Sequence, residues 1–215
     1  MKLNIRTFFI LMTTIILALV GWLLCIFITN SVCWRLWQFS NQNVTTMWIG
    51  LWKACYLERK SPAEFEVVCD QLDSLWDELE EFHYFQDLII LSDFLQAYGL
   101  ILNVGALLSL LKEENCPNFI HTCHLIAAFS YILDGICVGV AVIYNSYLDV
   151  SGQSTLPDNF PYHLEKIIEK TFGHGLFFGI ASAVCSLVSG TVLSWHTCLS
   201  KSSRIQPKNS ILTII

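Results

Sequence analysis

The chain has 215 residues, of which 54% are hydrophobic and 14% are charged, and its formal net charge is −6. Soluble domains carry about a quarter charged residues, so this composition excludes an ordinary soluble protein and predicts an integral membrane protein. The length allows about four spans of about 20 residues and one small exterior domain. It excludes a large separate catalytic domain, and the acidic balance argues against nucleic acid as a partner.

Four apolar runs are long enough to cross a membrane, and they cover residues 8–28, 88–111, 124–147 and 175–199. The first run exceeds the apolar core of about 7–15 residues found in a signal peptide, so we expect it to be retained as a span. Residues 1–7, 112–123 and 200–215 are then cytoplasmic, and residues 29–87 and 148–174 form two extracellular loops. Membrane lipid is accordingly an expected partner.

Basic residues near the ends of these runs predict the orientation. Lys2 and Arg6 precede the first run, whereas Lys201, Arg204 and Lys208 follow the fourth in a tail without acidic residues. By the positive-inside rule, both termini are expected in the cytoplasm. The first extracellular loop then carries ten acidic and four basic residues, which accounts for a net charge equal to that of the whole chain.

The first extracellular loop predicts a small antiparallel sheet. Residues 33–39 and 44–56 are rich in aromatic and β-branched residues, as strands are, and residues 40–43 between them have turn chemistry. A second turn at Ser61-Pro62 precedes a further strand over residues 64–69. Cys55 and Cys69 are the natural disulfide pair in this oxidising compartment. Cys33 is then left without a cysteine partner in this loop.

Two segments of the loops predict helix. After Cys69, apolar residues recur at helical spacing over residues 72–82 with acidic residues on the other side, which predicts a short amphipathic extracellular helix. We interpret it as a solvated helix lying on the membrane or the sheet rather than as a ligand site. In the second loop, residues 162–170 form a short, polar, helix-like run.

The ordered motif in the first loop resembles the signature of the claudin family of tetraspan tight-junction proteins. Its residues here are Trp34, Gly50, Leu51, Trp52, Cys55 and Cys69. The similarity also covers the four runs, the 73–75 stretch after the second cysteine, and the Phe172-Gly173 pair before a glycine-punctuated fourth run. Two departures are the longer spacing between the cysteines and Gln86, which stands where the family usually has an arginine.

This resemblance implies a fold and a function. The fold is a left-handed bundle of four transmembrane helices, capped by an antiparallel extracellular sheet with one strand from the second loop. The function is structural: polymerisation in cis and in trans, with itself and other claudin-like proteins, into a paracellular barrier or charge-selective pore at tight junctions of the plasma membrane. Two alternatives are a tetraspan of the peripheral-myelin or epithelial-membrane type and an auxiliary subunit of a channel or receptor.

We expect neither an enzyme nor a cofactor, because the exterior segments show no nucleophile-base or paired-carboxylate arrangement. In pore-forming relatives, the strand that carries the second cysteine faces the paracellular path. By that resemblance Glu64, Glu66 and Asp70 are the candidates for charge selectivity, since carboxylates in a narrow passage attract cations. The alternative is that they are ordinary solvated surface acids.

Three further kinds of site follow from short motifs. Asn43 begins a glycosylation sequon. Thr213, Ile214 and Ile215 form a possible PDZ-binding end, by which claudins generally reach junction scaffolds, although an apolar tail without a partner has the same sequence. Three juxtamembrane cysteines are candidates for palmitoylation. They are Cys116, Cys123 and Cys198.

Titratable residues also lie near and inside the spans. Cys116, His121, Cys123 and His124 lie close together, but their spacing matches no standard zinc site, so no metal is predicted. Asp93 and Asp134 lie within spans, where a carboxyl group is a functional candidate. A proton or ion relay is one interpretation. We favour hydrogen bonds inside the bundle to such neighbours as Gln96, Asn103 or Ser130, with Gly99, Gly105, Ala106, Gly135, Gly139 and Ala141 allowing close helix approach.

Overall fold

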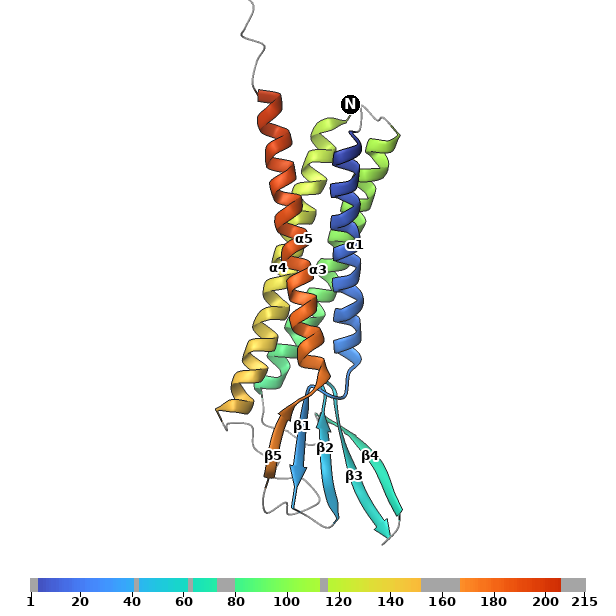
Figure 1. The fold of residues 1–215 in the computed structure, drawn as a ribbon, viewed down its shortest axis with the longest axis vertical. Coiled ribbons are helices and arrows are strands. Elements are labelled where there is room, and N and C mark those ends of the chain that lie inside the picture. Colours follow the sequence, from blue (N-terminus) through green and yellow to red (C-terminus); the bar gives the residue numbers. More distant parts are fainter. Residues whose placement is uncertain are drawn as a thin grey trace, which may run out of the picture.

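The computed structural model describes residues 4–40, 43–61, 64–72, 80–112, 116–151 and 167–205. Four long helices form a bundle, and a small sheet projects from one end of it (Figure 1). The helices are α1 (Ile5–Asn30), α3 (Glu80–Leu111), α4 (Pro117–Val150) and α5 (His174–Ile205). Each is long and apolar enough to cross a membrane, which confirms the predicted mainly α membrane fold.

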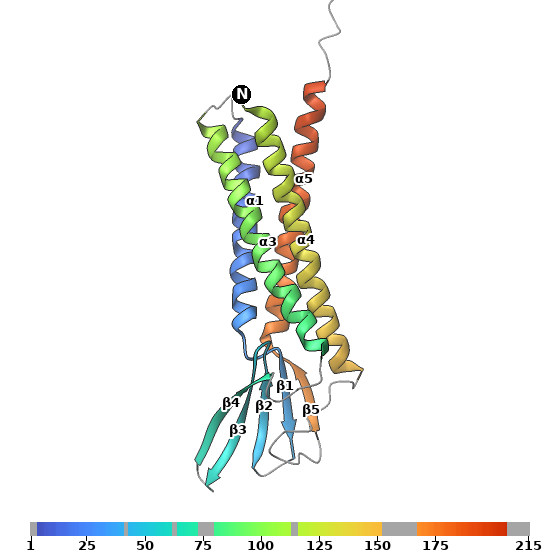
Figure 2. The ribbon, with the colours of Figure 1, turned by 180° about the vertical axis from the view of Figure 1, so that it is seen from behind.

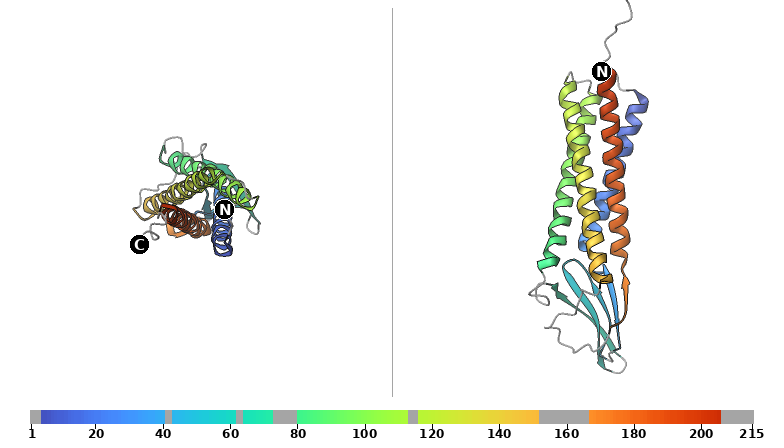
Figure 3. Two further views of the ribbon diagram at one scale, coloured as in Figure 1. Left: turned by 90° about the horizontal axis from the view of Figure 1, so that it is seen from above. Right: turned by 90° about the vertical axis from the view of Figure 1, so that its left-hand side faces the viewer.

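The four helices are arranged as a ring. α1 packs against α3 and α5, and α4 packs against the same two helices. α1 and α4 therefore lie diagonally opposite each other in the ring (Figure 3). Large apolar side chains such as Phe94, Ile143 and Trp195 point away from the bundle and are exposed. This is the pattern of helices solvated by lipid, whose backbone groups are satisfied within each helix.

The helices are longer than the apolar runs that predicted them. α3 already includes residue 80 and α4 begins at Pro117, ahead of the predicted starts at 88 and 124. A hydropathy pattern omits polar turns such as those around Gln86 and Asn118, although a helix continues through them without difficulty. Proline at the first position suits the start of α4, because its missing N–H would have no helical partner there.

The sheet contains five antiparallel strands in the order β4-β3-β2-β1-β5 (Figure 2). β1 (Arg35–Phe39), β2 (Val44–Ile49), β3 (Lys53–Ser61) and β4 (Glu64–Gln71) follow one another along the chain. β5 (Ile167–Phe172) comes from the segment before α5 and pairs with β1. Strands from two distant parts of the sequence therefore form one sheet, as the resemblance implied.

Two predictions about these strands are wrong. Residues 44–56 are not one strand, because the chain turns at Gly50, whose N–H donates to the Lys53 carbonyl oxygen at 2.9 Å. This turn lies among apolar residues and lacks the polar turn chemistry that sequence patterns detect. Residues 167–170 are strand rather than helix, because pairing with β1 overrides a weak local preference. Residues 73–79 of the predicted acidic helix lie outside the described residues.

One face of the sheet, here called the inner face, is buried. It contains Trp37, Met47 and Tyr56, which belong to the same hydrophobic cluster as Ile28 of α1 and Leu148 of α4. The sheet and the adjoining end of the bundle therefore share one core. A separate cluster fills the opposite end of the bundle.

Candidate functional site

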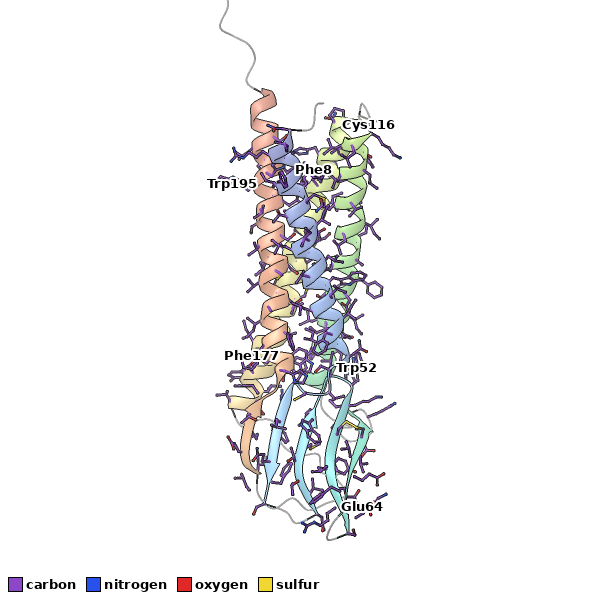
Figure 4. The ribbon with its side chains drawn as sticks, turned by 45° about the vertical axis from the view of Figure 1, so that its right-hand side comes forward. Phe8, Trp52, Glu64, Cys116, Phe177 and Trp195 are labelled. Carbon is purple, nitrogen blue, oxygen red and sulfur yellow. A yellow bond between two sulfur atoms is a disulfide. The ribbon has the colours of Figure 1, made fainter. Side chains whose placement is uncertain are left out.

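The signature residues surround the junction between the sheet and the bundle. Trp34 is buried, and its indole Nε1–H donates to the carbonyl oxygen of Ile28 at 2.9 Å. Leu51 is also buried, whereas Trp52 is 37% exposed and lies where the sheet meets the bundle (Figure 4). Its position suits the level at which tryptophan is enriched in membrane proteins.

Gly50 is required at this junction by close contact between backbones. A Cβ atom there would lie 2.5 Å from the carbonyl oxygen of Ser31 and 2.7 Å from the Cα of Val32. Any side chain would therefore push the turn away from the end of α1. Glycine, which has no Cβ atom, permits this close approach of the backbone.

Gln86 connects the turn to α3. Its Nε2 donates to the carbonyl oxygen of Leu51 at 2.8 Å, and its Oε1 lies 3.2 Å from Nδ1 of His83. Gln86 is buried and neutral, so it gives the Leu51 carbonyl oxygen of the turn a hydrogen-bond donor without burying a charge. The residue that departs from the expected arginine is thus part of the junction.

Cys55 and Cys69, the predicted pair, form a disulfide between opposite positions of β3 and β4. The bond joins the edge strand to the sheet near the end of β4 that returns toward the bundle. Cys33 is a free, half-buried thiol. It lies against Gly173, where a Cβ atom would be 2.8 Å from its Sγ.

The three acidic candidates share one face of the edge strand β4. Glu64, Glu66 and Asp70 alternate along the strand, and Ala54, which lies opposite Asp70, places them on the inner-face side. Glu64 lies near the tip of the sheet farthest from the bundle (Figure 4). Tyr56 donates its hydroxyl proton to Asp70 Oδ2 at 3.2 Å, which fixes the orientation of that carboxylate.

Lys60 reduces the negative charge of this group. Its Nζ forms an ion pair with Glu66, and both side chains are about half exposed. The hydrogen bond to Glu66, together with its charge, raises the pKa of Lys60. Lys60 is therefore cationic at neutral pH, and Glu66 is the partly neutralised member of the three acids.

A polar network that the sequence analysis missed lies between β1 and the end of α4. Arg35 is 2% exposed, and its Nε and Nη2 donate to the side-chain and backbone oxygens of Asn145 at 2.6 and 3.0 Å. Trp37 Nε1–H donates to Asp149 at 3.2 Å, and the Lys170 ammonium lies 4.7 Å from the Trp37 ring centroid. The spacing of Asn145 and Asp149, one helical turn apart, was the available signal.

Burial affects the charge of this network. Removal from water lowers the pKa of Arg35 to about 10, although the nearby Asp149 acts in the opposite direction. Arg35 therefore remains cationic at neutral pH. Burial likewise lowers the pKa of Lys170, again against the effect of Asp149. The network fastens β1 to α4 with charge-assisted hydrogen bonds, and Lys170 of β5 joins it through its contact with the Trp37 ring.

The structure places the remaining predicted sites far apart. Asn43 is exposed just before β2, where a glycan would have space, and glycosylation stays a prediction. Cys116 and Cys198 are exposed near the end of the bundle away from the sheet, whereas Cys123 is buried in the core. Palmitoylation also stays a prediction. Residues 213–215, the possible PDZ-binding end, lie outside the described residues.

Histidines gather near the same end of the bundle. The α5 residue His196 interacts electrostatically with His124 of α4, as does His121. Each of the three rings has one buried nitrogen without a hydrogen-bond partner. Within the part of the chain that the structure describes, no group of three or more His, Cys, Asp or Glu side chains is arranged to hold a metal ion.

The intramembrane acids have partners other than those predicted. Asp134 is bonded to Ser92, and Asp93 accepts from Thr29 at 3.1 Å. Gln96 instead donates to the Ala18 carbonyl oxygen, and the nearest partners of Asn103 are Thr14 and Tyr131. The prediction of hydrogen bonds inside the bundle is right in kind, but the rotation of each helix decides which residues meet.

These features define a four-span membrane protein with a disulfide-bonded sheet at one end of its bundle. No family model matches the chain. It is 25% identical over 181 residues to claudin-3 of Rattus norvegicus, covering 82% of this chain and 77% of the relative. It is 24% identical over 186 residues to claudin-4 of Chlorocebus aethiops, covering 84% and 83%, and 24% identical over 184 residues to claudin-4 of Homo sapiens, covering 83% and 82%.

These similarities support a divergent member of the claudin family. The similarity extends over most of the chain. It agrees with the four spans, the five-stranded sheet and the Cys55–Cys69 bond. In general terms, the relatives support a claudin-like tight-junction protein that is multi-pass and non-enzymatic.

Proposed function

We propose that this protein polymerises with itself and with other claudin-like proteins at tight junctions, and that β4 makes the resulting paracellular path cation-selective. The observation that carries the proposal is the placement of Glu64, Glu66 and Asp70 on one face of an edge strand. An edge strand is the part of a sheet that a neighbouring molecule or a passage between molecules can reach.

Glu64 and Glu66 are close enough to act together, because residues two apart in a strand are separated by about 7 Å, which is within the Debye length of about 8 Å at physiological ionic strength. Asp70 is four residues from Glu66, about 13 Å along the strand, and contributes more weakly to the summed field. Glu58 of β3 lies opposite Glu66 and adds a fourth carboxylate, whereas Lys60 supplies one positive charge. The sum is negative, so cations are attracted and anions repelled.

The proposal places the sheet outside the cell and both termini in the cytoplasm. In Figure 1, α1 begins and α5 ends at the end of the bundle away from the sheet. Basic residues lie near the start of α1 (Lys2 and Arg6) and near the end of α5 (Lys201 and Arg204), as the positive-inside rule requires of cytoplasmic ends. The predicted loops, 29–87 and 148–174, then supply the strands on the outside.

The test is expression in epithelial cells that lack junction strands, followed by measurement of Na⁺ against Cl⁻ dilution potentials. Asp70→Lys and Glu64→Lys should each shift the preference from Na⁺ toward Cl⁻. Glu169→Lys is the matched control, because Glu169 is an exposed acid on β5 at the opposite edge of the sheet. Equal shifts for Glu169→Lys, or none for either β4 variant, would overturn the role of β4.

Polymerisation has its own readout. Freeze-fracture images of transfected fibroblasts should show continuous strands. Surface-delivered protein without strands would contradict polymerisation, and co-purification with a channel or receptor in that case would establish the auxiliary-subunit alternative.

We also propose that the end Thr213-Ile214-Ile215 binds a PDZ scaffold, since it combines a hydroxyl residue with an apolar carboxyl terminus. Deleting Ile215 should abolish recovery of a purified PDZ domain from a pull-down. Undiminished recovery would refute this part of the proposal without affecting the rest.

A further inference from the structure

A chain of polar side chains connects three helices inside the bundle. Thr29 of α1 donates its hydroxyl proton to Asp93 Oδ2 of α3 at 3.1 Å. One turn deeper, Cys25 Sγ lies 3.4 Å from Ser92 Oγ, which is in turn bonded to Asp134 Oδ1 of α4. Cys25, Ser92 and Asp134 are at most 1% exposed.

The chain of contacts begins near the sheet and runs inward. Thr29 is the penultimate residue of α1, whose last turn meets the sheet (Figure 1). Cys25 is four residues earlier, which is about 6 Å deeper along a helix. Cys25 also interacts electrostatically with Asp93, so the thiol lies near the outer carboxyl as well as near Ser92.

Asp134 occupies a site that is costly for a negative charge. A buried carboxylate without a compensating charge or enough hydrogen bonds is strongly unfavourable. Its Oδ1 contacts Ser92, but its Oδ2 is buried without a hydrogen-bond partner. A carboxylate has about four acceptor sites, so the contact with Ser92 and the nearby Ser186 hydroxyl leave part of its charge unsatisfied.

Among the residues that the structure describes, the groups that interact with Asp134 supply no positive charge. Those that interact with it electrostatically or by hydrogen bonding come from every helix: Cys25 of α1, Ser92 and Asp93 of α3, Tyr131 and Cys137 of α4, and Ser186 of α5. None of these is a cation, and Asp93 is a second carboxyl. Two neighbouring carboxyls favour one bound proton, because like charges repel.

We propose that Asp134 is an intramembrane proton-binding site and that Ser92, Cys25 and Asp93 form its route to the sheet side of the bundle. In the loaded state Asp134 donates to Ser92, Ser92 to Cys25, and Cys25 to the Asp93 carboxylate. For release, each proton moves one place along this chain. Asp134 then loses one proton, Asp93 gains one, and the hydroxyl and the thiol each keep theirs.

The ligand in this proposal is a proton rather than a metal ion. In the described ranges, no three His, Cys, Asp or Glu side chains converge as metal ligands. A hydrogen-bonded chain of hydroxyl, thiol and carboxyl groups, in contrast, needs no further ligand to transfer a proton. The proposal is independent of polymerisation and of ion selectivity at β4.

The test is infrared spectroscopy of the purified full-length protein in lipid nanodiscs at neutral pH. We expect the carbonyl stretch of a protonated carboxyl, which Asp134→Asn should remove because the amide keeps the size and hydrogen-bonding capacity of the acid. Asp93→Asn should retain the band. Absence of the band, or its persistence in Asp134→Asn, would overturn the proposal.

The route has a separate readout in the rate at which this band shifts after transfer to D₂O. Cys25→Ala and Ser92→Ala should slow the exchange several-fold, because each interrupts the chain. Cys185→Ala is the control, since this thiol of α5 lies outside the chain of contacts. Unchanged exchange in both interrupted variants, with the band intact, would refute the route. Size-exclusion profiles verify that each variant is folded.

Discussion

The amide Nε2 of Gln86 lies 2.8 Å from the carbonyl oxygen of Leu51, which bonds the central residue of the turn between β2 and β3 to helix α3. Both residues are buried. The sheet is therefore fastened to the bundle at the signature motif itself, by a contact independent of the disulfide.

Replacing Gln86 by leucine should destabilise the fold by about 1–3 kcal/mol, because the buried Leu51 carbonyl loses its partner. Thermal unfolding in detergent would show this as a lower midpoint. Asp87→Asn is the control, since Asp87 is exposed on the same helix. Equal midpoints for Gln86→Leu and wild type would contradict a stabilising role for this contact.

Removing the disulfide should loosen β4. The double substitution Cys55→Ser, Cys69→Ser is expected to cost about 3 kcal/mol in the chain-entropy account of a short cross-linked loop. Limited proteolysis should then cleave between β3 and β4 at a protease concentration that the wild type survives. Cys116→Ser, at the other end of the bundle, should behave as wild type. Resistance of the double variant would show that Tyr56 and its neighbours hold the strand without the bond.

Two glycines of α4 should respond differently to alanine. At Gly135 a Cβ atom would lie 2.7 Å from Leu187 Cγ and 3.0 Å from the Ala183 carbonyl oxygen, so Gly135→Ala should lower the unfolding temperature. At Gly139 nothing lies within 4 Å, and Gly139→Ala should be neutral or stabilising by up to about 1 kcal/mol through helix propensity. The reverse order would mean that α4 and α5 do not meet at Gly135.

Arg35 should not tolerate replacement by lysine. Lysine lacks the planar donor arrangement that reaches both oxygens of Asn145, so Arg35→Lys is expected to recover little of the stability lost in Arg35→Met. Loss of a buried charge partner costs about 3–5 kcal/mol. Surface delivery and thermal midpoint measure the effect, with Arg59→Lys as the exposed control. Full recovery by lysine would exclude a geometric role for the guanidinium.

Neutralising Lys60 should increase the preference for cations. Lys60→Gln releases Glu66 from its ion pair and makes the β4 face more negative. In the dilution-potential assay, Na⁺ permeability relative to Cl⁻ should rise. This rise should be larger at low ionic strength than at high, because salt screens exposed charges. Lys53→Gln, at the bundle end of β3, is the charge-matched control. A fall in Na⁺ preference would show that Lys60 does not face the ion path.

Local patterns predicted some of these features because the determinants lie close together in sequence. Span length and hydropathy predicted the four helices, and Ser61-Pro62 marked the turn that places Cys55 opposite Cys69. The turn at Gly50 was missed because its surroundings are apolar. A single glycine within a β-branched and aromatic stretch carries too little local signal.

Other features depend on which residues meet across the fold. β5 is a strand because β1 offers it a partner, and Ser92 rather than Ser130 contacts Asp134 because of how α3 and α4 are rotated. Arg35 and Asn145 are 110 residues apart in sequence. The local pattern of one segment carries no information about the distant residue that it contacts. These contacts therefore could not be predicted from one sequence.

The strand order β4-β3-β2-β1-β5 gives the sheet two unlike margins. One margin is acidic and cross-linked by a disulfide, whereas the other comes from the segment leading into α5. Copies joined margin to margin would all point the same way, as in a head-to-tail contact that extends without closing. A row built in this manner would have a beginning and an end, and a partner able to cap only one of them could control its direction of growth.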